Sequence, residues 1–474
     1  MLRKAISPRA AGSRYWDEHW QTMPREDLDR VHLQRNQRLI KYAYENVPLY
    51  RRLYEQADLK PEDVRTWDDF YRRVPFTDKP HFLADQAAGG SETDQGRGGF
   101  QTRPYGGQGL DLEHGLHVFQ TTGTTGTPLR ELVSRYDEHS LADPILVELW
   151  DLGLRPGDSI YYCFNFGIWI GLWAFYWCAR RLGLQVLSGG GLGSEERVRQ
   201  IISLKPTALA ATPTYLLHLA DVARGMGLDP REAGVKYLIG GGEPGFGIEA
   251  TRRALAENWG VGNNIGDTYG IGECMHAGIE CAAHPGGVHA PEKVLHSYSV
   301  DPETGEKVGD GQVGENVVTS HCRSAQIFIK YRTHDLVERH ESFDHGCGWT
   351  WAFLKGGVLG RTDNMMVIRG VNVFPTAVED LLGRVPGATN YYEMHVTREG
   401  GMDRLKVKVE AAGDVEAAHY PELARRAEEV YRTVMGLRLE VEVVSPKTLP
   451  RYELKTTRFF DHRPPEVRRK LDRR

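Results

Sequence analysis

Apolar runs and helical patterns alternate through the middle of the chain. Between residues 155 and 270, the runs SIYYCF, LQVLSG, TALAAT and VKYLIG are separated by helical segments such as Glu195–Leu204 and Tyr215–Arg224. Buried strands that alternate with helices are typical of a parallel α/β sheet. Glycines follow two of these runs, at 189–191 and 240–242. Because ligands of open α/β sheets bind beyond the carboxyl ends of the strands, these two loops are candidate binding loops.

The pattern differs on either side of this region. Residues 24–60 begin with Pro24 and carry apolar positions at helical spacing, which predicts helices. Residues 87–115 are rich in Gly, Gln and Asp, which predicts a long loop. Between 286 and 360, frequent turn residues and short alternating runs such as ENVVTS predict an antiparallel or barrel-like subdomain.

A further change after Arg361 predicts a second domain. Short strands at 366–368, 392–396, 405–409 and 439–444 flank helices at about 376–383 and 416–436. We therefore predict an α/β protein with a large N-terminal domain (residues 1–361) and a smaller α+β C-terminal domain (362–474). The first would combine parallel α/β sheets with a small β-barrel-like subdomain. A length of 474 residues fits two or three domains.

Composition and charge exclude several classes of protein. The chain is 40% hydrophobic with a net charge of −5, which argues against disorder and against general binding to nucleic acids or anionic membranes. The stretch 159–179 lacks charge, but Asn165, Gly167 and Gly171 interrupt it, so we expect a strand, a bend and a helix rather than a membrane span. The basic N-terminus lacks the apolar core of a secretory signal. Six cysteines in so long a chain fit a reducing, cytoplasmic compartment.

The segment QTTGTTGTP (120–128) has the composition of a phosphate-binding loop. Gly123 and Gly126 permit turns whose backbone N–H groups converge on one anion, and five threonines add hydroxyl donors. A flexible linker is the alternative interpretation, but an apolar strand at 116–119 immediately precedes the segment. The Gly-Lys-[Ser/Thr] ending of a Walker A loop is missing. A compensating cation must therefore come from elsewhere in the chain or from a metal.

Together with four later segments, this loop resembles the adenylate-forming superfamily of acyl-CoA synthetases, and specifically its phenylacetate-CoA ligase branch. The segments are DTYGIGE (267–273), YRTHD (331–335), GRTDNMMVIRGVNVFP (360–375) and LPRYELK (449–455). The N-terminal stretches YWDEHWQTMPRED and KYAYENVPLYRR also resemble this branch. The likeness covers nearly the whole chain in the same order. It implies that a carboxylate attacks the α-phosphate of Mg·ATP, and that a thiol, normally that of coenzyme A, then attacks the acyl-adenylate.

The resemblance also assigns nucleotide contacts residue by residue. It implies that the threonine-rich loop holds the triphosphate and that Tyr269 lies against the adenine. Asp335 would accept hydrogen bonds from the ribose hydroxyls, and Arg361 would meet the phosphate or ribose. The complete nucleotide-binding set is Thr121, Thr122, Gly123, Thr124, Thr125, Gly126, Thr127, Gly241, Gly242, Glu243, Asp267, Thr268, Tyr269, Asp335 and Arg361.

Catalysis is assigned by the resemblance to Lys455, Glu273 and Thr122. Lys455 would bridge the carboxylate and the α-phosphate, and would leave when the C-terminal domain rotates about a hinge at Asp363. Glu273 would bind Mg²⁺ through carboxylate oxygen. Two positions depart from the family pattern. Thr127 stands where the family usually has Lys, and Leu454 stands where it usually has Gly.

The segment FNFGIWIGLW (164–173) occupies the place of the aryl-acid pocket in this branch. Asn165, Phe166 and Trp169, together with Gly241, are the predicted pocket residues. A rigid aromatic wall favours a small flat acid over a long flexible chain, so the predicted substrate is a small aromatic carboxylic acid. Asn165 and His276 would bond to a polar ring substituent.

Helical spacing links Trp169 to two further tryptophans. Trp169, Trp173 and Trp177 recur every four residues, which predicts one shared helix face. Core packing is the alternative interpretation of such a stripe, and we favour it for Trp177.

Cysteine and histidine gather in one region of the chain. The branch often has Cys-x-Cys, a following Gly-x-His and a later Cys-Pro-Cys-Gly, and this chain carries a modified version of that pattern. The resemblance implies a structural Zn²⁺ site. Its ligands would be Cys281, His289, His345 and Cys347. Scattered histidines on exposed turns are the alternative interpretation.

The function favoured by these motifs is that of a cytoplasmic, AMP-forming aryl-CoA ligase that uses ATP, Mg²⁺ and coenzyme A. One alternative keeps adenylation but passes the acyl group to a carrier-protein thiol or to a nitrogen nucleophile in natural-product biosynthesis. Another is a non-catalytic nucleotide-binding relative. The branch is often dimeric, so a homodimer stays open, while no nucleic-acid or membrane partner is expected.

Overall fold

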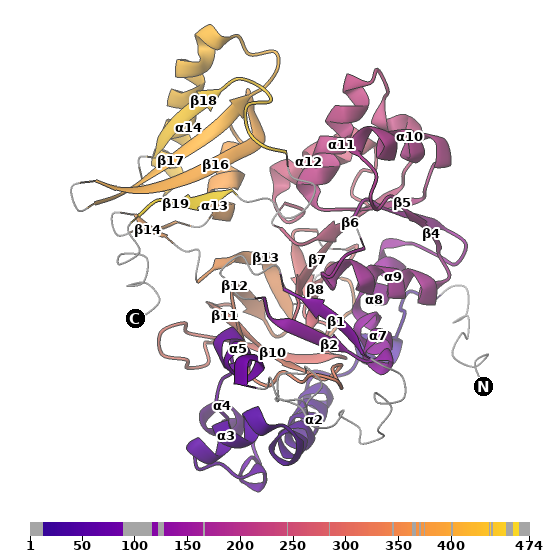
Figure 1. The fold of residues 1–474 in the computed structure, drawn as a ribbon, viewed down its shortest axis with the longest axis vertical. Helices are drawn as coiled ribbons and strands as arrows, with labels where there is room; N and C mark the ends of the chain where they lie inside the picture. The colour runs from indigo at the N-terminus through magenta and orange to yellow at the C-terminus, as the bar shows by residue number, and fades with distance from the viewer. Residues whose placement is uncertain are drawn as a thin grey trace.

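The computed structural model describes most of the chain (Figure 1). The described residues are 13–88, 116–121, 128–164, 166–243, 245–283, 285–343, 346–362, 366–368, 371–373, 375–399, 402–435, 437, 439–451 and 458–463. Part of the predicted site falls outside these ranges, as does most of the predicted loop at 87–115. The predicted site residues concerned are Thr122–Thr127, Asn165, His345, Asp363 and Lys455.

Helices form the N-terminal part of the structure, as the apolar spacing predicts. They are α1 (Glu18–Gln21), α2 (Arg25–Asn46), α3 (Pro48–Gln56), η2 (Pro61–Asp63), α4 (Trp67–Arg73) and α5 (Lys79–Ala88). Pro48 opens α3, where its fixed φ suits the first turn and its missing N–H costs no hydrogen bond. Tyr50, fully buried in α3, donates a hydrogen bond to the Ile327 carbonyl at 3.1 Å and ties these helices to the sheet above them.

Parallel strands and their helices build the middle of the chain, which confirms the alternating pattern. The strands are β3 (Ser159–Tyr162), β4 (Gln185–Ser188), β5 (Ala208–Ala210), β6 (Tyr237–Gly241) and β7 (Ile265–Ile271), paired in the order β4-β3-β5-β6-β7. The helices are α7 (Arg135–Leu141), α8 (Asp143–Leu152), α9 (Gly171–Leu182), α10 (Ser194–Leu204), α11 (Pro213–Gly225), η3 (Pro230–Ala233) and α12 (Glu249–Trp259).

Antiparallel strands follow, as predicted for residues 286–360. They are β8 (Met275–Ile279), β9 (Gly287–His289), β10 (Leu295–Val300), β11 (Val313–Ser320), β12 (Tyr331–His340) and β13 (Phe353–Arg361). Among the described residues they join the parallel strands in one 11-stranded sheet, rather than standing apart from it. The junction is the antiparallel pairing of β7 with β8. The turn between these two strands therefore lies where the character of the sheet changes.

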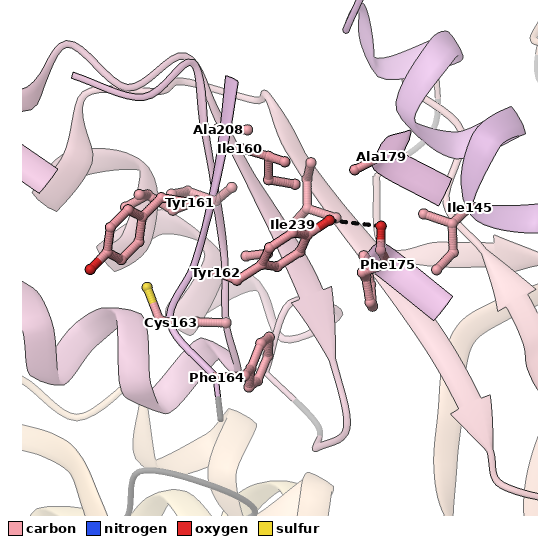
Figure 2. Close-up of a cluster of buried hydrophobic side chains, with 14 of the residues drawn as sticks. Ile145, Ile160, Tyr161, Tyr162, Cys163, Phe164, Phe175, Ala179, Ala208 and Ile239 are labelled. Atoms are coloured by element: carbon pink, nitrogen blue, oxygen red, sulfur yellow. Dashed lines mark hydrogen bonds between the residues drawn. The ribbon is translucent and has the colours of Figure 1, made fainter. Parts of the chain in front are cut away.

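The uncharged stretch 159–179 folds as a strand, a bend and a helix, as expected. Ile160, Tyr161 and Tyr162 of β3 are completely buried, and Figure 2 shows Tyr162 donating a hydrogen bond to the Phe175 carbonyl of α9, at 2.7 Å. The absence of charge thus reflects a strand covered on both faces. Within the described part of the chain, no helix combines the length and the apolar character that crossing a membrane requires.

The C-terminal part forms a separate domain, drawn orange to yellow in Figure 1. It contains β14 (Met366–Ile368), β15 (Val371–Val373), α13 (Pro375–Leu382), β16 (Ala388–Glu399), β17 (Met402–Ala411), η4 (Ala417–His419), α14 (Tyr420–Met435), β18 (Glu440–Val444) and β19 (Phe459–Asp461). Strands β18-β17-β16-β19 form one sheet, and α13 and α14 share its core. The predicted strands and helices are confirmed, whereas β15 and β19 were not predicted.

Candidate active site

The threonine-rich segment connects the two strands of a hairpin. Strands β1 (His117–Gln120) and β2 (Arg130–Val133) pair antiparallel. The Thr121 N–H donates to the Leu129 carbonyl at 2.9 Å, and the Leu129 N–H donates to the Thr121 hydroxyl at 3.0 Å. These two hydrogen bonds join Thr121 and Leu129 at the two ends of the loop, and the Thr121 hydroxyl accepts one of them.

Tyr269, Asp335 and Arg361 come from three different motifs and meet in one cluster. The Tyr269 hydroxyl on β7 donates to Asp335 Oδ2 on β12 at 2.6 Å, and Arg361 Nη1 on β13 lies 2.8 Å from Asp335 Oδ1. Asp335 and Arg361 are direct partners in the antiparallel register. Burial, and then the charge of Asp335, raise the pKa of Tyr269 well above its usual value, so the phenol stays protonated and donates.

Glu273 lies in the turn between β7 and β8, close to another motif. It is 7% exposed, and its Oε1 accepts a hydrogen bond from the Tyr331 hydroxyl at 2.6 Å. Burial, together with the charge of Glu273, raises the pKa of Tyr331 well above its usual value. The YRTHD motif thus orients the predicted Mg²⁺ ligand through its first residue and supplies Asp335 through its last.

The predicted adenine-side loop is built by close backbone approach. Gly241 on β6 pairs with Thr268 on β7, and a Cβ at Gly241 would stand 1.9 Å from the Thr268 carbonyl oxygen. No side chain fits there. The carboxylate of Glu243 accepts a hydrogen bond from the backbone N–H of Thr214, in the first turn of α11, at 3.0 Å. Glu243 therefore anchors this loop to α11.

Two acids lie on or against the strand that carries Tyr269. Asp267 belongs to the predicted nucleotide-binding set, whereas the sequence patterns did not identify Glu148. Thr268 donates to Glu148 Oε2 of α8 at 2.7 Å, and Glu148 is 1% exposed. Asp267 occupies the preceding position, where burial raises its pKa to about 6. One acid within an apolar stretch of α8, PILVELW (144–150), is the signal that could have marked Glu148.

The structure describes two of the predicted aromatic acyl-pocket residues, Phe166 and Trp169. Phe166 packs edge-on against Trp173 and Tyr176, with ring centroids 5.2 and 5.6 Å away. Trp169 is 37% exposed and approaches Gly242, where a Cβ would lie 3.9 Å from its ring. The predicted common helix face is wrong for Trp169, because α9 begins only at Gly171, which leaves Trp169 in the bend.

His276 lies beside this aromatic segment and is buried without a hydrogen-bond partner among the described residues. It pairs with Gly270 across β7 and β8, and its ring meets Phe175 of α9 edge-on at 5.9 Å. It is 3% exposed, and among the described residues neither ring nitrogen has a hydrogen-bond partner. Burial lowers its pKa to about 3, so the ring is neutral and offers one donor and one acceptor.

Three of the four predicted zinc ligands gather at one point. The ligand atoms of Cys281, His289 and Cys347 all lie within 4.8 Å of one another, and all three residues are buried. A hydrogen bond from Cys281, followed by the influence of His289, lowers the pKa of Cys347 to about 4. His289 Nδ1 lies 3.0 Å from the Trp351 carbonyl, which leaves Nε2 toward the thiols. These donors fit Zn²⁺; the fourth, His345, lies outside the described residues.

The C-terminal domain contacts α11 and α12 of the larger domain. The Tyr391 hydroxyl donates to Asp221 at 3.0 Å, and the Arg451 guanidinium lies 3.4 Å from the centre of the Tyr391 ring. A small cavity lies at this contact, lined by Thr214, His218, Tyr391, Tyr392, Arg451 and Arg458 among others. Because Thr214 also holds Glu243, this contact lies next to the predicted adenine-side loop.

Comparison with known proteins gives the same picture over nearly the whole chain. Residues 54–328 match the AMP-binding enzyme family, and residues 370–463 match the AMP-binding enzyme C-terminal domain. The chain is 32% identical to a phenylacetate-coenzyme A ligase of Thermus thermophilus, over 91% of this chain and 96% of that protein.

Solved structures add information on the arrangement of the domains. The chain superimposes on a 2-hydroxyisobutyryl-CoA ligase in its postadenylation state with a TM-score of 0.88, at 29% identity over 99% of this chain and 96% of that one. Against the same enzyme in its thioesterification state the TM-score is 0.70, at 30% identity and the same coverage. The arrangement here thus agrees better with the postadenylation state. Taken together, these likenesses identify the chain as a member of the AMP-binding enzyme family and, within it, of the phenylacetate-CoA ligase-like, AMP-forming CoA ligases.

Proposed function

We propose that this enzyme activates a small aromatic carboxylic acid as its acyl-adenylate and transfers the acyl group to coenzyme A. The observation that carries the adenylation step is the meeting of Tyr269, Asp335 and Arg361. In this proposal Asp335 accepts hydrogen bonds from the ribose, Tyr269 lies against the adenine, and the loop closed by Thr121 holds the phosphates.

The residues Glu273 and Lys455 are proposed to balance the charge of the reaction. Glu273, oriented by Tyr331, would hold Mg²⁺, which neutralises phosphate charge when bound. Lys455 would approach the carboxylate and α-phosphate from the C-terminal domain. We place the domain boundary after Arg361, at the end of β13, with the hinge at Asp363.

Aromatic rings and one unsatisfied histidine support the proposed acid. Trp169 lies near the adenine-side loop and Phe166 packs against Trp173, and such aromatic surroundings favour a flat ring. A buried polar atom without a partner costs free energy, so a substrate group that bonds to His276 would be selected. We propose a polar substituent or ring nitrogen on the aromatic acid. A small hydroxy acid is the second candidate, because His276 suits a hydroxyl and a similar structure is a 2-hydroxyisobutyryl-CoA ligase.

A panel of acids compared in pairs tests this proposal. Pyrophosphate release is measured with benzoate, phenylacetate, their hydroxy derivatives, pyridine carboxylates, small hydroxy acids and long-chain fatty acids, with and without coenzyme A. We expect a polar aromatic acid to exceed its unsubstituted parent in kcat/KM by about tenfold or more, because one buried hydrogen bond separates them. His276→Leu should abolish this preference for the polar acid, whereas His419→Leu, at an exposed position, should keep it.

The other outcomes of the panel are equally informative. Preference for long-chain fatty acids would refute the aromatic pocket, and preference for small hydroxy acids would favour the second candidate. AMP release that depends on a carrier protein or an amine instead of coenzyme A would identify that molecule, and not coenzyme A, as the acyl acceptor. No acid-dependent pyrophosphate release with any acid would overturn the proposed function as a whole.

We also propose that Cys281, His289 and Cys347 hold a structural Zn²⁺ with His345. The purified protein is then expected to contain about one zinc per chain by elemental analysis, as a closed four-ligand site does. Cys281→Ser should lose the metal and lower the melting temperature, because metal binding contributes to folding. Cys178→Ser, which alters a buried thiol in α9, should keep the zinc. Wild-type protein free of zinc when purified without chelator would contradict the assignment.

A further inference from the structure

Glu131 is a buried carboxylate at the foot of the threonine-rich loop. It lies on β2, opposite Phe119 of β1 and two residues beyond Leu129, which closes the loop. Its side chain is completely buried, and neither carboxylate oxygen has a hydrogen-bond partner among the described residues. A charge in such a place costs several kcal/mol, on the order of the desolvation penalty of an ion, unless a cation compensates it.

The carboxylate of Glu131 is directed at the turn that carries Glu273. A Cβ placed on Gly272, the residue before Glu273, would stand 1.7 Å from Glu131 Oε1 and 2.9 Å from Oε2. Glycine at 272 is therefore what allows the two segments to approach. The carboxylate of Glu131 thus lies against the turn that holds Glu273.

Within the described part of the chain, no cation donates a hydrogen bond to Glu131. Arg323 and Lys79 are the positive groups that act on Glu131, yet among the described residues neither donates a hydrogen bond to it. Arg323 Nη2 is directed to the Leu132 carbonyl at 3.2 Å and to Gln326 Oε1 at 3.3 Å. The nearby loop also carries Thr127 and no lysine. Glu131, whose two oxygens are unpartnered among the described residues, and Glu273 thus offer the carboxylate oxygens that a hard divalent cation prefers.

We propose that Glu131 is a second carboxylate ligand of the divalent cation at Glu273, so that this chain binds the cation through two protein carboxylates before the nucleotide arrives. The inference rests on the proposed role of Glu273 and extends it. A divalent cation bound at this site would allow both carboxylates to ionise inside the protein. It would also place positive charge next to the base of the threonine-rich loop. Glu131 is then a cation-binding residue of the adenylation site.

Direct cation binding tests the proposal without relying on activity. Mn²⁺ is titrated into nucleotide-free protein, and free Mn²⁺ is followed by electron paramagnetic resonance. We expect about one Mn²⁺ per wild-type chain, and a dissociation constant raised at least about tenfold by Glu131→Gln or by Glu273→Gln, since each removes a ligand. Glu196→Gln, which changes an exposed acid of α10, should bind as the wild type does.

A second variant guards against misfolding. Glu131→Val replaces the carboxylate by an apolar side chain suited to a buried strand, and Mn²⁺ should raise the melting temperature of the wild type but not of this variant. Equal Mn²⁺ affinity in wild type and Glu131→Gln, or no Mn²⁺ binding by nucleotide-free wild type at millimolar concentration, would overturn the proposal. These outcomes differ from failure of the proposed function, which the acid panel reports independently of Mn²⁺ binding.

Discussion

Replacing Lys455 with alanine is expected to abolish adenylation while leaving thiolysis of a supplied acyl-adenylate largely intact. The ammonium group is proposed to neutralise charge that develops between the attacking carboxylate and the α-phosphate, a contribution worth about 10²–10³ in rate. The C-terminal domain is proposed to rotate before the second step, so that the lysine would no longer take part. The measurement compares acid-dependent pyrophosphate release with thioester formation from synthetic acyl-adenylate and coenzyme A.

The matched control is Lys447→Ala, eight positions earlier in the chain. Lys447 is exposed in the turn after β18. Its backbone N–H donates a hydrogen bond to Glu410 Oε2 at 3.0 Å, and alanine retains this N–H. This variant should retain both half-reactions. Equal loss of both steps in Lys455→Ala would rule out the assigned role, since it would indicate a general defect of the domain.

Asp335→Ala is expected to cause the second large effect. The carboxylate holds the Tyr269 hydroxyl and Arg361 together and is proposed to accept both ribose hydroxyls. Hydrogen bonds to a charged group contribute about 1.5–3 kcal/mol each, so kcat/KM for ATP should fall by about 100-fold or more. Leaving the buried Tyr269 hydroxyl without its acceptor should also lower the free energy of unfolding by about 1–3 kcal/mol. Steady-state kinetics with varied ATP and urea unfolding measure the two effects.

Glu338→Ala is the control on the same strand. Glu338 pairs with Lys355 at 3.1 Å and with His340 at 3.0 Å near the surface, three residues beyond Asp335. Exposed ion pairs contribute about 0–1 kcal/mol, so the KM for ATP should stay unchanged. An Asp335→Ala enzyme that is less stable but keeps the wild-type KM for ATP would show that Asp335 is structural and does not bind ribose.

Local pattern was sufficient for most of the elements. The alternation of apolar runs with helical spacing predicted β3 to β6 and the helices between them, because interior strands of a parallel sheet, such as the fully buried β5, are apolar. The order of five motifs predicted the family. Glycine at 241 is another local requirement, since the Thr268 carbonyl oxygen lies where a side chain would be.

Side-chain partnerships between distant segments could not be read from the chain. Glu131 and Glu148 each occur as one acid in an apolar run, and nothing local says that Glu131 lies against Gly272 or that Glu148 accepts from Thr268. Trp169 illustrates the opposite error, because regular spacing suggested a helix that begins only at Gly171. The four-residue spacing of the tryptophans indicates helical periodicity, but it does not fix the first residue of α9, which depends on how the bend before Gly171 packs.

The sequence by itself thus determined the class of fold, the family and the chemical groups available, because these depend on residue type and on order along the chain. The tertiary structure alone decided which groups are neighbours: Tyr331 with Glu273, Glu243 with Thr214, and Glu148 with Thr268. These partners are up to 120 residues apart in the chain, as between Glu148 and Thr268. Such contacts arise from strand pairing and burial, and their electrostatic consequences exist only once water has been removed from around them.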